Sequence, residues 1–163
     1  MALMVNSKIA CSVTNYGGFA ILFIASLLTH PSMSTGKGTK ASPWKLKTPP
    51  GTSEYTMYQE GDVIFCTVGK TVLQYNAAAI KDTVTMLKKH GDWMELGSAD
   101  EQKPAKEGTV EAWARSAKNP VKGWYGLKKG LRGRFGMYMP PLLEALGLVE
   151  LEHNPKGNRM RVK

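Results

Sequence analysis

Residues 140–152, with the sequence PPLLEALGLVELE, decide the fold of the C-terminal third of this chain. The two prolines suit the first turn of a helix, because a backbone N–H at that position has no partner within the helix. Gly147 is a typical residue to end the helix. The stretch therefore predicts a short helix followed directly by a β-strand that begins at Leu148. We expect these side chains in the core: Leu142, Leu146, Leu148 and Val149.

A basic hairpin follows the predicted helix. Residues 148–152 and 159–163 have the composition of strands, and the sequence HNPKGN between them is typical of a turn. A helix that ends in LLEALG and runs straight into LVEL and such a hairpin resembles the recognition helix and wing of winged-helix proteins. The resemblance covers about residues 137–163. With weaker support upstream, it implies a winged-helix-like part that spans residues 77–163.

Ahead of this part, the sequence indicates a β-hairpin. Two runs rich in β-branched and aromatic residues, 63–68 and 71–75, flank Gly69 and Lys70. A two-residue loop with glycine first is typical of a type II′ turn. A weaker strand is predicted at 55–58. The expected fold class is α+β, with an N-terminal β-hairpin followed by a winged-helix-like domain.

A helix is predicted over residues 77–90. Asn76 can cap its start, and Gly91 follows its end. Apolar residues recur at helical spacing and indicate one core-facing side. The residues of that side are Ile80, Val84 and Leu87.

Two further segments complete a single predicted α+β domain, residues 44–163. Thr109 can cap a short helix at 110–116. Residues 123–136 contain five glycines, each of which costs about 1 kcal/mol relative to alanine inside a helix. We therefore expect no long regular helix in that segment.

The N-terminal part divides into an extension, residues 1–32, and a polar leader, residues 33–43, that is expected to be flexible. The apolar run at 19–28 has about ten residues, whereas a membrane-spanning helix needs about 20. It is interpreted as a secretion signal, as an interfacial anchor, or as upstream sequence from an early start codon. The last is favoured, because Lys8 is the only charge before the run and gives a poor signal peptide.

The chain is strongly basic. It has 22 Lys and Arg against 13 Asp and Glu, a formal charge of +9. Residues 104–163 contain 12 Lys and Arg but 5 acidic residues, and no acid interrupts the basic run from Arg115 to Arg134. Such a run favours polyanionic partners. With the predicted wing, it indicates a nucleic-acid-binding protein, with duplex DNA as the expected partner and transcriptional regulation as one role.

The residues expected to contact nucleic acid lie where a winged helix meets a duplex, at the entrance of the recognition helix and at the tip of the wing. Basic side chains there can contact phosphates, and the two aromatic residues either stack on bases or pack in the core. The predicted contact residues are Lys122, Trp124, Tyr125, Lys128, Lys129, Arg132, Arg134, Lys156, Arg159 and Arg161.

Two other function classes are compatible with this sequence. The first is a protein–protein interaction module on the same fold, whose partner is another protein or a second copy of the chain. The second is a small enzyme with no recognised motif. Gly130, Gly133 and Gly136 can cradle a phosphate, but the Lys-Ser/Thr of a P-loop does not follow them. No catalytic residue, no cofactor and no membrane partner is expected.

Metal binding is not expected either. Cys11 and Cys66 form no CxxC pair and no cluster with a histidine, so zinc-ligand spacing is missing. Without Cys11, which lies in the N-terminal extension, Cys66 is unpaired, and this suits a reducing, cytoplasmic compartment. Four acidic residues fit a solvated loop better than a metal site. They are Asp92, Glu95, Asp100 and Glu101.

Three segments carry a family resemblance: WKLKTPPGTSEYTMY at 44–58, HGDWMELGSADEQ at 90–102 and GWYGLKKGLRGRFGMY at 123–138. They are similar to a family of short uncharacterised bacterial proteins, over about residues 33–163. The resemblance implies a bacterial origin and a start near Met33. It carries no catalytic residues that could be assigned to this chain.

Overall fold

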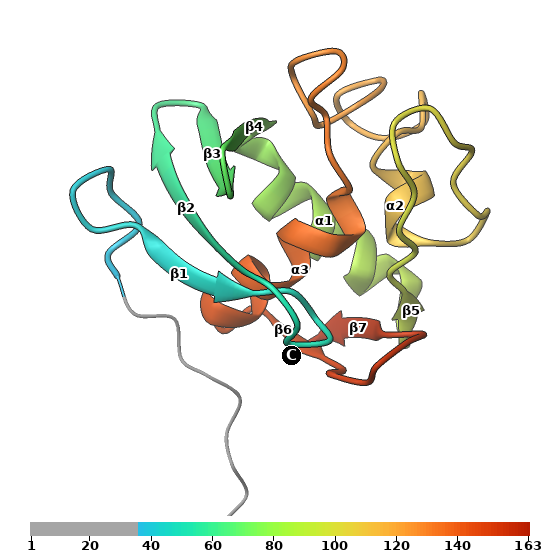
Figure 1. Cartoon of the computed structure of the whole chain (residues 1–163). Coiled ribbons are helices and arrows are strands. Elements are labelled where there is room, and N and C mark those ends of the chain that lie inside the picture. The colour runs from blue at the N-terminus through green and yellow to red at the C-terminus, as the bar shows by residue number, and fades with distance from the viewer. Residues whose placement is uncertain (1–35) are drawn as a thin grey trace, which may run out of the picture. The chain divides into compact units, whose positions relative to one another are not determined.

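The computed structural model of this chain describes residues 36–163. The expectations for the extension 1–32 and for the start of the leader lie outside the described residues. Within the described part, no helix combines the length and the apolar character that a membrane span requires. The architecture of these residues is α+β, as predicted, with two antiparallel sheets and three helices (Figure 1).

The larger sheet consists of four antiparallel strands in the order β1-β2-β3-β4. They are β1 (Trp44–Lys47), β2 (Glu54–Glu60), β3 (Val63–Val68) and β4 (Thr71–Asn76). The predicted hairpin is confirmed as β3 and β4, which pair Val68 with Thr71 across a two-residue loop. Gly69 has a φ of 57°, and Lys122 is the only non-glycine residue with a positive φ in residues 36–163. The loop thus has a positive φ at its first position alone, as a type II′ turn requires.

One face of this sheet forms the centre of the core. Alternate residues of the strands point toward it, as the two-residue period of a strand dictates. Cys66 lies in the middle of β3, opposite Met57 on β2 and Leu73 on β4. Burial raises the pKa of its thiol, so the thiol stays protonated in the folded domain. The buried side chains of this face are Leu46, Tyr55, Met57, Ile64, Cys66, Leu73 and Tyr75.

Helix α1 (Ala78–His90) follows β4 directly. The side-chain oxygen of Asn76 accepts a hydrogen bond from the first backbone N–H of the helix (2.9 Å), and Gly91 ends the helix with a φ of 79°. The predicted end of the helix is confirmed, whereas its start lies one residue later than predicted, with Ala77 in the N-cap position and no side-chain hydrogen bond from that cap. The buried side differs from the predicted one, because Ile80 and Val84 are half-buried. The buried residues of α1 are Ala79, Thr83 and Leu87.

A smaller sheet closes the C-terminal part of the domain. β5 (Met94–Glu95) pairs with β7 (Arg159–Val162), and β7 pairs with β6 (Val149–Leu151), which gives the order β5-β7-β6. The predicted C-terminal hairpin is confirmed by the antiparallel pairing of β6 with β7. Two helices lie between β5 and β6 in the chain, α2 (Val110–Trp113) and α3 (Phe135–Ala145) (Figure 1).

Helix α3 begins earlier than predicted, so that Pro140 and Pro141 lie inside it rather than in its first turn. Neither proline can donate a backbone hydrogen bond to the preceding turn, which costs stability. Burial offsets this cost, because seven of the eleven residues of α3 are buried. The hydroxyl of Tyr55 on β2 donates a hydrogen bond to the backbone oxygen of Tyr138 (2.8 Å) and fixes α3 against the larger sheet.

Leu146 is not a core residue, contrary to the prediction. It is the C-cap of α3 and is 37% exposed, because the chain turns away at Gly147, whose φ is 73°. Leu142 and Val149 are buried as predicted, and Leu148 is half-buried.

The glycine-rich segment between α2 and α3 contains no regular helix, as predicted, and it covers one edge of the larger sheet. Gly126 forms an isolated bridge with Tyr75 of β4. The backbone N–H of Leu127 donates to the oxygen of Gln74 (2.9 Å). Unpaired backbone groups at a sheet edge invite pairing with other chains, so this segment protects β4.

Candidate nucleic-acid interface

Arg115, which follows α2, ties the loop between β5 and α2 to the body of the domain. Its guanidinium donates hydrogen bonds to the backbone oxygens of Ala99, Asp100 and Lys103. The same guanidinium pairs with Glu111, with 2.7 Å between Arg115 Nε and Glu111 Oε1. Because its side chain is only 9% exposed, Arg115 has a structural role and little surface for an external phosphate.

Glu111 is a buried carboxylate that joins α2 to the start of α3. One oxygen faces Arg115, and Oε2 accepts a hydrogen bond from the backbone N–H of Gly136 (2.6 Å), in the first turn of α3. Burial raises the pKa of this carboxyl group, while the N–H of Gly136 and the charge of Arg115 act in the opposite direction. Glu111 therefore fixes the point at which the basic segment enters α3.

Gly136→Ala is expected to destabilise the domain by about 1–3 kcal/mol, the usual cost of overpacking. A Cβ at this position would lie 2.5 Å from the backbone oxygens of Leu96 and Gly97, which cannot move as a flexible side chain can. Gly123→Ala is the matched control, because a Cβ there meets no atom within 4 Å. Urea unfolding compares the two variants, and equal stabilities would contradict the close packing described here.

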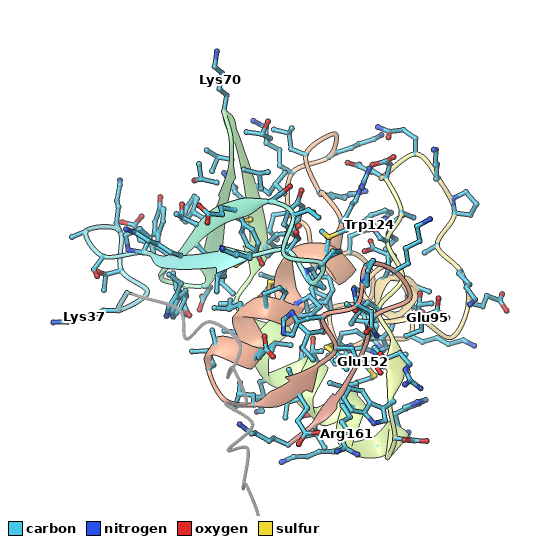
Figure 2. All side chains as sticks on the ribbon, turned by 60° about the horizontal axis from the view of Figure 1, so that its bottom comes forward. Lys37, Lys70, Glu95, Trp124, Glu152 and Arg161 are labelled. Atoms are coloured by element: carbon cyan, nitrogen blue, oxygen red, sulfur yellow. The ribbon has the colours of Figure 1, made fainter. Side chains whose placement is uncertain are left out.

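Trp124 contacts arginines rather than presenting a free ring. The guanidinium carbons of Arg115 and Arg132 lie 4.4 Å and 4.7 Å from the centroid of its ring, distances typical of cation–π contacts. The side chain is half-buried, among the loops that connect the helices (Figure 2). A base could stack on a covered ring face only if the arginine moved away.

Tyr125 belongs to the core, and its predicted contact with nucleic acid is corrected. The residue is fully buried, and its ring stacks against that of Trp113 with the centroids 5.3 Å apart. Its hydroxyl donates a hydrogen bond to Asp82 of α1 (2.8 Å). Because the side chain has no exposed surface, it cannot stack on a base in the folded domain. Of the two predicted alternatives, packing in the core is the observed one.

Two arginines before α3 pair with adjacent carboxylates of the loop between β5 and α2. Arg134 Nε lies 2.8 Å from Asp100 Oδ1, and Arg132 Nη1 lies 3.5 Å from Glu101 Oε1. Glu101 also accepts hydrogen bonds from the backbone N–H groups of Gly130 (3.0 Å) and Arg132 (3.2 Å). The N–H of Gly130 holds the pKa of Glu101 below its usual range, and the hydrogen bond from Arg134 does the same for Asp100.

The arginines of the β6–β7 hairpin are also paired. Arg159 Nη2 lies 2.7 Å from Glu152 Oε1, and Arg161 Nη2 lies 2.6 Å from Glu150 Oε2. Both guanidinium groups lie over the ring of Trp93, at 5.6 Å and 4.7 Å. Figure 2 labels Arg161 and Glu152 on this hairpin. These exposed pairs contribute little to stability, so either arginine can exchange its partner for another anion.

Lysines carry the positive charge that no carboxylate neutralises. Every arginine of the chain pairs with a carboxylate, whereas among the lysines of residues 36–163 only Lys47 and Lys106 do so. The predicted contact residue Lys156 is exposed between β6 and β7. Five more exposed lysines lie on the β5–α2 and α2–α3 connections, which gather at one end of the domain (Figure 1). We call them the loop surface: Lys103, Lys118, Lys122, Lys128 and Lys129.

Three of the four acidic residues that were predicted to be a solvated patch take part in ion pairs, whereas Asp92 only accepts a hydrogen bond from the backbone N–H of Trp93. Asp100 and Glu101 pair with arginines 34 and 31 positions away in the chain, and Glu95 pairs with Lys106 (2.5 Å). No local sequence pattern connects partners at such separations, which is why these pairs were missed. In the described part of the chain, no group of three or more His, Cys, Asp or Glu is placed to hold a metal ion.

A cavity of about 260 Å³ lies between the turn after β1, the start of α3 and the tip of the β6–β7 hairpin. Its lining contains two charged side chains, Glu95 and Lys156, together with proline, glycine and other uncharged residues. Glu95 already pairs with Lys106. Among these lining residues, no nucleophile is hydrogen-bonded to a base, so the cavity gives no basis for assigning an enzymatic reaction.

Comparison with known proteins places the chain in a family. A family model described as "Family of unknown function (DUF6855)" matches residues 36–163, which agrees with the resemblance to an uncharacterised family. No curated protein and no solved structure matches the chain.

Proposed function

This chain belongs to DUF6855, a family of unknown function, and from its surface we propose that it binds nucleic acid through phosphate contacts of the loop surface. The lysines of the loop surface make these contacts, and the exposed Lys156 lies apart from them on the β6–β7 hairpin. Lysine is a compact point charge that attracts phosphates without reading base edges. The proposed binding is therefore largely independent of the nucleotide sequence, and duplex DNA is the first ligand to test.

The distribution of charge between the two basic residue types carries this proposal. Each arginine is held by a carboxylate, so arginines add little net charge to the surface. The excess of +9 is therefore presented by lysines, and the basic run of the loops contains no acid. The α2–α3 connection thus has a one-sided positive charge, which attracts a polyanion and speeds its association.

The winged-helix resemblance supports the proposal in part. The order α1-β5-α2-α3-β6-β7, with the hairpin at the end, is the order expected of a winged helix. However, α3, which has the place of the recognition helix, carries no basic residue and packs against the larger sheet. A helix that reads bases must enter the major groove with exposed side chains. For this reason the proposal assigns binding to the loops beside α3 and not to α3 itself.

Changing Lys128 and Lys129 together to alanine is expected to weaken duplex binding and to flatten its salt dependence. Each neutralised phosphate contributes a log–log slope of about −0.9 on duplex DNA, so the loss of two contacts changes the slope by about 2. The measurement is a titration of the full chain with mixed-sequence duplex at several salt concentrations.

The matched control is the double change of Lys88 and Lys89 to alanine. These lysines are also adjacent, exposed and without an ion pair among the described residues, but they lie in the last turn of α1. The control removes the same charge and is expected to leave the slope nearly unchanged. Equal effects of both double variants would remove the loop surface from the proposal, and absence of binding at low salt would remove the function itself.

A protein–protein interaction module is the second function to consider, because one observation favours it. The outer face of the larger sheet carries Tyr58 and Phe65, stacked with their centroids 4.9 Å apart and half-buried. Val72 on the neighbouring strand is 41% exposed. Light scattering of the full chain tests self-association through this face. A dimer that Val72→Lys dissociates, together with no duplex binding at low salt, would favour this function.

A further inference from the structure

The turn before α3 forms a cradle of donors around one carboxylate. The backbone N–H of Gly130 donates to Glu101 Oε1 (3.0 Å), and the backbone N–H of Arg132 donates to Glu101 Oε2 (3.2 Å). The guanidinium of Arg132 approaches the same carboxylate at 3.5 Å. The φ of Gly130 is 82°, a left-handed conformation that glycine adopts without strain.

This donor set has the chemistry of a phosphate site. Two converging backbone N–H groups and a guanidinium match two oxygens of a tetrahedral oxyanion as well as they match a carboxylate. In the described part of the chain, Arg132 Nε is a buried atom with no hydrogen-bond partner, so this guanidinium has donor capacity that Glu101 does not use. The guanidinium of Arg134 lies one residue further on and is held by Asp100.

We propose that the cradle formed by Gly130 and Arg132 is a phosphate-binding site that Glu101 fills as an internal competitor. A phosphate takes the position of the carboxylate, and the Glu101 side chain turns into solvent. The backbone of its loop stays in place, because Arg115 holds the oxygens of Asp100 and Lys103 independently of Glu101. The inference rests on the proposed function only where it identifies the phosphate as part of nucleic acid.

This arrangement reduces affinity for phosphate and raises selectivity. A weakly bound anion cannot displace a carboxylate that is already within the chain. A polyanion that is attracted by the loop surface adds further contacts and can displace it. The cradle then opens to ligands that engage several lysines at once.

The test compares Glu101→Ala with Glu107→Ala in the full chain. Glu107 lies on the same loop, is exposed and forms no ion pair among the described residues, so both variants lose the same charge. Inorganic phosphate is titrated while backbone amide resonances are followed. We expect Glu101→Ala to bind phosphate about tenfold more tightly than Glu107→Ala, because the Glu101 carboxylate no longer competes with phosphate for the charge-assisted hydrogen bonds of the cradle. The largest shifts are expected at the amides of Gly130 and Arg132.

Equal affinities of the two variants, or shifts confined to other residues, would overturn the inference. Glu101→Gln keeps the size of the side chain and is expected to change affinity in the same direction, so a folding defect of the alanine variant does not end the test. A parallel titration of the unchanged chain with duplex DNA separates the two proposals. Duplex binding without a phosphate response in Glu101→Ala rejects the cradle alone, and the reverse result rejects only the nucleic-acid function.

Discussion

Leu142→Ala is expected to destabilise the domain by about 2–5 kcal/mol, the usual cost of a large-to-small change in a packed core. Leu142 is fully buried in α3, and its neighbours include the buried prolines of the same helix. A helix with two internal prolines depends on burial more than on its own hydrogen bonds. Loss of this side chain should therefore affect the whole helix. Urea unfolding followed by circular dichroism measures the change.

Leu146→Ala is the matched control for this prediction. It is the same substitution at the end of the same helix, but Leu146 is 37% exposed. We expect a change of about 0.5 kcal/mol or less, as for other surface substitutions. If both variants lost the same stability, α3 would not be packed as described.

Glu111→Ala is expected to cost about 3–5 kcal/mol, because it leaves the guanidinium of Arg115 without its carboxylate in a nearly buried position. The N–H of Gly136 at the start of α3 also loses its acceptor. Arg115→Ala removes the other partner, and a double-mutant cycle then isolates the coupling between the two side chains. Thermal and urea unfolding of the three variants provide the measurement.

Glu150→Ala is the control for the buried pair, because it breaks an ion pair with Arg161 whose two side chains are both exposed. Such pairs contribute about 0–1 kcal/mol. A loss of the same small size in Glu111→Ala would show that the junction between α2 and α3 does not depend on the carboxylate.

Local patterns predicted the elements that local interactions determine. The β3–β4 hairpin follows from Gly69 and its flanking β-branched residues, and α1 follows from Asn76 just before it and from its terminal glycine. Thr109 accepts the hydrogen bond that its N-cap position predicted. The predicted start of α3 at Pro140 was wrong. Burial of the turn that begins at Phe135 against other elements overrides the preference of proline for a helix start.

The candidate site was predicted less well, since its key contacts join distant parts of the chain. The basic run was visible in the sequence, but the pairing of Arg132 and Arg134 with Glu101 and Asp100 was not. Trp124 and Tyr125 are neighbours with different environments, because Trp124 is half-buried under two arginines and Tyr125 is fully buried. Tyr125, and not Trp124, lies in the core because the glycine-rich segment pairs with the β4 edge of the larger sheet at Gly126 and Leu127, a contact that no local sequence pattern reveals.

Cys66 gives this domain a built-in reporter of local opening. Its thiol lies in the centre of the larger sheet, fully buried and protonated, so a thiol-modifying reagent cannot reach it while β3 remains paired with both neighbours. In a Cys11→Ser variant, the rate of modification by an excess of reagent measures how often these strands separate. Stability of this sheet can thus be followed separately from that of the C-terminal hairpin, and with nucleic acid or phosphate present.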